Sequence, residues 1–168
     1  PPERFGPLPD HLYENRGDSF AEHSLTEQLK PGKGLGVLVA DLNADRRPDL
    51  YIANDAGDNA LYFNRGGGQF DERGVAAGVA TDDNGRFNGS MGLDVGDFDG
   101  SGQPSLAVTN YQGELTALYR AIGSETFHSQ SQAAGLGAAG LEFVGFGVAF
   151  VDYDRDGWLD LAAVNGHV

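Results

Sequence analysis

The sequence predicts an all-β protein, a partial β-propeller of about three blades, each blade a four-stranded antiparallel sheet. The first observation behind this prediction is composition. Glycine provides 26 of 168 residues, about twice the usual ~7% share, and 17 of the 25 acidic residues are aspartate. Because glycine costs a helix ~1 kcal/mol, this composition favours strands joined by turns. The second observation is internal repetition, which propeller blades show along the chain and sandwich strands do not.

The first repeated unit occurs at residues 34–55, 90–111 and 145–166. Each copy has an apolar run, a nine-residue loop rich in Asp, and a second apolar run, as in GVLVADLNADRRPDLYIAND of the first copy. Short β-branched and aromatic runs bounded by Asp, Asn and Gly are typical of strands, so the unit is predicted as strand, loop, strand. Its aligned positions are Gly36, Gly92 and Gly147, then Asp41, Asp97 and Asp152, then Asn54, Asn110 and Asn165.

The second repeated unit lies at residues 11–24, 60–73 and 117–130. Each copy has a short apolar-aromatic run, a turn (NRGD, NRGG or AIGS), then phenylalanine among polar residues. This pattern predicts a β-hairpin. The two units together supply four strands in about 55 residues, and the Ala/Gly stretches that follow, RGVAAGVA and SQAAGLG, are expected to form no more than single helical turns.

The phase of the repeats divides the chain into one propeller domain of four parts. A half blade is expected at 1–33, whole blades at 34–89 and 90–144, and a second half blade at 145–168. Closed propellers need ~4 to 8 blades, so the terminal half blades are expected to pair with the rest of a longer chain or with other protein subunits. Their unpaired edges would otherwise be templates for association.

Charge and composition exclude several classes of function. The net charge of −14 opposes binding to nucleic acid and to anionic membrane surfaces. No run of 18 apolar residues occurs, so membrane insertion is not expected. The absence of cysteine rules out thiolate metal sites, iron–sulfur clusters and a cysteine nucleophile.

The nine-residue loops of the first unit carry oxygen side chains at positions 1, 3, 5 and 9, which suits Ca²⁺ with its 6 to 8 oxygen ligands. Position 7 would add a backbone carbonyl. The expected ligands are Asp41, Asn43, Asp45, Arg47 (carbonyl) and Asp49 in loop one; Asp97, Asp99, Ser101, Gln103 (carbonyl) and Ser105 in loop two; and Asp152, Asp154, Asp156, Trp158 (carbonyl) and Asp160 in loop three.

Carboxylate number predicts that loops one and three bind structural Ca²⁺ ions, with loop three the tightest. Loop two is a weaker third candidate because serine stands at its positions 5 and 9. Arg46 replaces glycine at position 6 of loop one, where a left-handed conformation would weaken the site. The alternative is that these residues only cap hairpin turns.

The loops and hairpins together resemble the FG-GAP/VCBS repeat family, the β-propeller also found in integrin α subunits, with its DxDxDGxxD calcium hairpins. The pattern GVxxxDxDxDGxxDLxxxNG, followed by LYxNxGxxxF, and the terminal NGHV are closest to proteins that carry an ASPIC/UnbV module. The resemblance implies that the calcium ligands occupy the positions named above. It also implies an extracellular, periplasmic or cell-envelope location and a structural, scaffold or adhesion role. The resemblance is unspecific for activity, and we expect no enzymatic activity.

The alternative function is a propeller that binds or cleaves polysaccharide. Acid pairs such as Asp82 and Asp83 could supply general acid and base, which require two carboxylates at a defined separation. Phe146, Phe150 and Trp158 could form a platform for glycans, although aromatic residues on propeller strands usually pack between blades. A pocket at the ring axis with two metal-free carboxylates would distinguish the enzyme from the scaffold.

Overall fold

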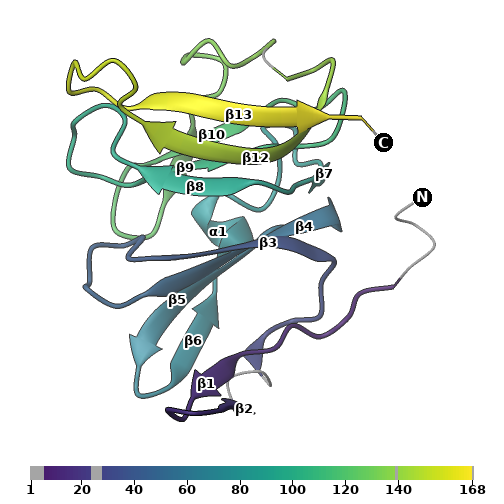
Figure 1. The fold of residues 1–168 in the computed structure, drawn as a ribbon, viewed down its shortest axis with the longest axis vertical. Coiled ribbons are helices and arrows are strands. Elements are labelled where there is room, and N and C mark those ends of the chain that lie inside the picture. Colours follow the sequence, from purple (N-terminus) through teal and green to yellow (C-terminus); the bar gives the residue numbers. More distant parts are fainter. Residues whose placement is uncertain (1–5, 24–27, 139, 168) are drawn as a thin grey trace.

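Antiparallel strands dominate the computed structural model, which describes residues 6–23, 28–138 and 140–167 (Figure 1). The predicted all-β class is confirmed. The one helix in the described part of the chain is the single turn α1 (Gly74–Ala77), within the RGVAAGVA stretch. None of the described helical structure has the length and apolar character needed to cross a membrane. The expected half blade 1–33 and the unit 11–24 fall partly outside the described residues.

The first large sheet has the order β3-β4-β5-β6, with β7 paired to the far end of β4. Four strands were expected here, and β7 is a fifth. β5 pairs with β4 only over Leu50–Ile52, and β7 pairs with the end of β4 beyond them, across a bulge at Ala56, whose φ is 52°. The strands are β3 (Gly34–Ala40), β4 (Asp49–Gly57), β5 (Ala60–Gly66), β6 (Gln69–Glu72) and β7 (Asn88–Gly89).

The second large sheet is a simple antiparallel meander, in the order β8-β9-β10-β11. Two hairpins, β1-β2 and β12-β13, stand as separate two-stranded sheets. The bounds are β8 (Leu93–Gly96), β9 (Ser105–Val108), β10 (Ala117–Ala121), β11 (Phe127–Ser129), β1 (Tyr13–Asn15), β2 (Phe20–Glu22), β12 (Val144–Val151) and β13 (Asp160–Gly166). The described strands do not close a ring, and the blade boundaries stay a prediction.

Strand β8 contacts both β3 and β12, so the first strands of the three units lie side by side (Figure 1). The aligned glycines lie at these contacts. A Cβ on Gly36 would lie 2.3 Å from the carbonyl oxygen of Met91, and a Cβ on Gly92 would lie 2.5 Å from the Cα of Gly147. The repeated glycine therefore lets neighbouring sheets approach closely, a role that the comparison of the three repeats did not reveal.

The hydrophobic core lies between the two large sheets. Its largest fully buried side chains include Tyr51, Phe63, Leu42 and Leu106. The hydroxyl of Tyr51 donates a hydrogen bond of 2.7 Å to the carbonyl of Val79, which satisfies both buried polar groups. Burial raises the pKa of Tyr51 well above its usual value, so the phenol stays neutral. This core fixes the strands that carry the acidic loops.

Candidate metal-binding loops

The three acidic loops lie on one side of the molecule, at the left in Figure 1, and each joins two paired strands. Position 1 of each loop directly follows β3, β8 or β12, and position 9 begins β4, β9 or β13. In all three loops the carboxylate at position 1 accepts hydrogen bonds of 2.8–3.1 Å from the backbone amides of positions 5 and 6. The loops therefore share one backbone conformation.

Positions 4 and 6 of every loop have positive φ. Glycine occupies both positions in loop two and position 6 in loop three, whereas Ala44 (62°), Arg46 (67°) and Arg155 (65°) adopt this conformation with a side chain. The sequence predicted the left-handed turn at position 6 and missed it at position 4. Gly100 was the only sequence signal for position 4, because the other two loops have alanine and arginine there.

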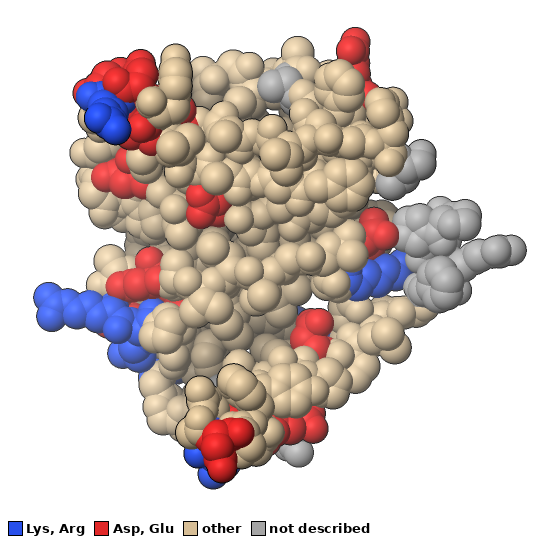
Figure 2. All heavy atoms as spheres, in the orientation of Figure 1, with Lys and Arg blue, Asp and Glu red and all other residues tan. Residues whose placement is uncertain are grey.

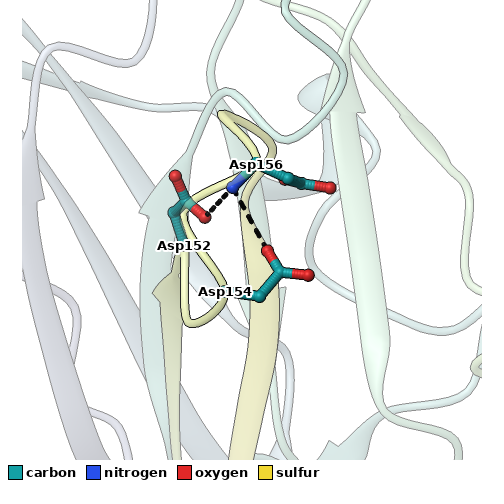
Figure 3. A group of neighbouring side chains, drawn as sticks. All are labelled: Asp152, Asp154 and Asp156. Atoms are coloured by element: carbon teal, nitrogen blue, oxygen red, sulfur yellow. Dashed lines mark hydrogen bonds between the residues drawn. The ribbon is translucent and has the colours of Figure 1, made fainter.

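Loop three brings three carboxylates together. Asp152, Asp154 and Asp156 each offer an oxygen, and these atoms all lie within 4.8 Å of one another (Figure 3). The Asp156 amide donates hydrogen bonds to Asp152 (3.1 Å) and Asp154 (3.2 Å), which orient both carboxylates. No ion pair neutralises this cluster within the described part of the chain. Figure 2 shows acidic side chains gathered at this end of the β12-β13 hairpin.

The remaining residues of loop three lie beside this cluster. Asp160 accepts one hydrogen bond, of 3.2 Å, from the amide of Tyr153, and the Trp158 amide donates to Asp156 at 2.8 Å. The indole of Trp158 lies over loop two, since a Cβ on Gly100 would be 3.4 Å from its ring. Phe150 packs against Gly96 of β8, as expected for an interblade aromatic, whereas Phe146 is about half exposed.

Loop one differs because Asp49 is fully buried. Its two carboxylate oxygens accept backbone hydrogen bonds from Leu42 (2.9 Å) and Asn64 (2.8 Å), so it ties the loop to β5. Burial raises the pKa of Asp49, and these two hydrogen bonds act in the opposite direction. The structure therefore gives Asp49 a role in holding the loop, which its spacing alone did not suggest.

Loop one contains a positively charged side chain, that of Arg47. The Arg47 side chain forms an ion pair of 2.5 Å with Asp45 and donates a 2.6 Å hydrogen bond to the carbonyl of Asn64. Asn43 donates to the same Asp45 oxygen at 3.0 Å. Burial favours the neutral form of Asp45, but hydrogen bonds from Arg47 and Asn43 and the charge of Arg47 outweigh it and lower the pKa. Sequence reasoning had assigned Arg47 only a carbonyl role.

Loop two also has a basic partner. Arg120 of β10 forms a 2.5 Å ion pair with Asp99, and hydrogen bonding from Ser101, followed by the charge of Arg120, lowers the pKa of that carboxyl. The Gln103 amide donates to the Ser101 hydroxyl at 3.3 Å. Ser105, at position 9, is buried, and its hydroxyl has no partner within the described residues.

The acid pair considered for an enzyme lines a hollow of about 480 Å³ together with Glu114 and Tyr119. Asp82 accepts backbone hydrogen bonds of 2.8 Å from Asn84 and Arg86. Glu114 accepts from two further backbone amides, at 2.8 and 3.2 Å. These carboxylates therefore fix the conformation of the surrounding loops.

Comparison with known proteins identifies the repeats. A family model described as FG-GAP-like repeat matches residues 41–108 and 97–163, which include all three acidic loops. This family model does not test the closer resemblance to proteins that carry an ASPIC/UnbV module, which stays a prediction. A search of curated proteins gave no significant match. Because the matched repeats span most of the sequence, the chain belongs to the FG-GAP-like repeat family.

Proposed function

We propose that this chain is a calcium-stabilised β-propeller segment that serves as a scaffold or adhesion module outside the cytoplasm, with Ca²⁺ held at least in loop three. FG-GAP repeats form propeller-like interaction modules, are generally non-catalytic and often bind calcium. Proteins with these repeats are typically extracellular or secreted. Calcium sites of extracellular modules have dissociation constants of ~10⁻⁴ to 10⁻³ M, which matches loops exposed to solvent.

The observation that carries the proposal is the carboxylate cluster of Asp152, Asp154 and Asp156. Like charges so close together repel one another, and a bound cation relieves that repulsion. Their oxygen ligands fit a hard cation that accepts flexible geometry. The family resemblance adds Asp160 and the Trp158 carbonyl to the ligand set. Bound Ca²⁺ would supply positive charge at the turn and hold β12 and β13 together.

A protein partner is supported by apolar strand residues that face solvent. Val37 and Val39 on β3 are 67% and 58% exposed, and Val164 on β13 is 65% exposed. Val37 and Val39 lie two residues apart, on one face of β3, and a patch of neighbouring exposed apolar side chains favours contact with other subunits or with further sequence of a longer chain. Glycans remain the second class of partner in this proposal.

Thermal unfolding with Ca²⁺ and with a chelator tests the proposal. Ca²⁺ at 100 times its dissociation constant would stabilise the protein by about 2.7 kcal/mol, which is ~5 to 10 °C for a domain of this size. Asp154→Asn should remove most of this shift. Asp83→Asn, the same change at an exposed acid outside the loops, should leave it intact. A midpoint that does not respond to Ca²⁺ in the unmodified protein would refute a structural ion in loop three.

A further inference from the structure

We propose that guanidinium groups of the chain itself, Arg47 in loop one and Arg120 beside loop two, take the place of a metal ion there, and that loop three alone is left to respond to Ca²⁺. This inference concerns the two loops that the proposed function leaves open. It changes the number of ions expected from the sequence, from two or three to one. The two arginines reach their loops by different routes, since Arg47 lies within loop one and Arg120 on β10.

In loop one, the described hydrogen bonds use every carboxylate oxygen of the expected ligands. The two oxygens of Asp41 accept the amides of Asp45 and Arg46. Both oxygens of Asp49 accept backbone amides within the core. One oxygen of Asp45 accepts the Arg47 amide at 2.9 Å, and the other contacts the Arg47 guanidinium. A metal ion in loop one would have to displace that guanidinium.

The guanidinium of Arg47 is anchored at two points. Its Nη2 contacts Asp45 at 2.5 Å, and its Nε donates to the carbonyl of Asn64 on β5 at 2.6 Å. The second contact lies outside the loop, so the side chain is held in place by the sheet as well as by charge. A planar group with several donors can satisfy a carboxylate and a carbonyl at once, which a lysine ammonium does less well.

Loop three has the same backbone conformation as loop one, but no guanidinium group pairs with its carboxylates in the described part of the chain. Both oxygens of Asp152 accept backbone amides, as those of Asp41 do. One oxygen of Asp154, one of Asp156 and one of Asp160 accept backbone amides, and the second oxygen of each has no hydrogen bond within the described ranges. Position 7, arginine in loop one, is Trp158 here. Arg155 is exposed and forms no ion pair in the described part of the chain. Loop three therefore keeps free oxygens that loop one does not have.

Loop two is the intermediate case. It has only two carboxylates, Asp97 and Asp99, and the guanidinium of Arg120 lies 2.5 Å from the latter. Both Asp97 oxygens accept backbone amides, from Ser101 and Gly102. Loop two has one positive charge for two negative charges and serine at two ligand positions, so its expected affinity for Ca²⁺ is low.

Counting bound ions by equilibrium dialysis with radioactive Ca²⁺ tests the proposal. The unmodified protein should bind one ion, and Arg47→Gln should bind two, because glutamine can still donate to Asn64 while it frees Asp45. Arg46→Gln is the matched control, since it removes the same charge from the same loop without breaking an ion pair, and it should still bind one. The second ion in Arg47→Gln should also make thermal stability depend more strongly on Ca²⁺.

Two ions in the unmodified protein, or no additional ion in Arg47→Gln, would overturn the proposal. If Arg47→Gln does not fold, two variants of the unmodified chain decide instead: Asp154→Asn should lose the ion and Asp45→Asn should retain it. Loss of an ion in Asp45→Asn would contradict the inference. A count of zero that rises to one in Arg47→Gln would refute calcium binding by loop three and support the role of Arg47.

Discussion

Replacing Arg46 with glycine tests the strained turn at position 6 of loop one. Arg46 has φ of 67°, a left-handed conformation that glycine adopts freely and other residues rarely adopt. Its side chain is exposed, and its amide donates a 2.8 Å hydrogen bond to Asp41 that glycine would keep. The substitution therefore changes backbone preference with little loss of contact.

The expected gain is the difference between two effects. A left-handed conformation costs a residue with a Cβ roughly 1–2 kcal/mol. Glycine makes the unfolded chain more flexible, which costs about 0.4–1 kcal/mol of stability. The net effect expected for Arg46→Gly is a stabilisation of about 0.5–1 kcal/mol, or ~1 to 4 °C in the unfolding midpoint for a domain of this size.

Urea unfolding followed by circular dichroism measures this gain, with Arg46→Ala as the control. Alanine removes the same charge and long side chain but keeps the Cβ, so it should leave the strain in place. Arg46→Gly should therefore be more stable than Arg46→Ala. If the glycine variant is equal to or less stable than the alanine variant, the left-handed turn does not cost what the φ value implies.

Three further predictions concern the core, the sheet contacts and a half-buried acid. Tyr51→Phe should destabilise the protein by about 1–3 kcal/mol in urea unfolding, because the buried carbonyl of Val79 loses its hydrogen-bond donor. An unchanged stability would mean that this carbonyl finds another partner. Gly92→Ala should cost ~1 to 3 kcal/mol or more in the same assay, since its Cβ would lie 2.5 Å from Gly147, and an unchanged midpoint would contradict that close approach. Burial raises the pKa of Glu114, so its carboxylate costs stability once the pH rises through the folded pKa. Glu114→Gln should be more stable than the unmodified protein at pH 7 and equal to it below pH 4.5, and the opposite pH trend would contradict a raised pKa.

Local sequence patterns determined the strands and the loops. Strands of this fold are short and bounded by turns, and the alternation of apolar runs with Asp-rich and Gly-rich segments placed the strand-loop-strand units and the hairpins. The turn-capping role of the position-1 aspartates, given as the alternative to metal binding, could also be inferred from the sequence. Their hydrogen bonds join residues that are only four and five positions apart. Interactions over such short separations depend on the order of residues and little on the rest of the chain.

The sequence was less informative where a residue's role depends on distant neighbours. Asp49 has the spacing of a ligand, yet it is fully buried and its oxygens accept the amides of Leu42 in loop one and Asn64 on β5. The fifth strand, β7, pairs with the end of β4, because β5 pairs with β4 only over Leu50–Ile52. Neither burial nor a free strand edge can be read from spacing along one loop.

Repeat number and spacing, with the set of oxygen side chains in each loop, were thus determined by the sequence itself. Which loops hold their own cation was decided by the tertiary structure. Arg120 reaches Asp99 from another strand, and Arg47 is fixed by a carbonyl of β5. The physical reason is that charges act through space, so two loops with similar sequences differ once the folded chain places a guanidinium beside one of them.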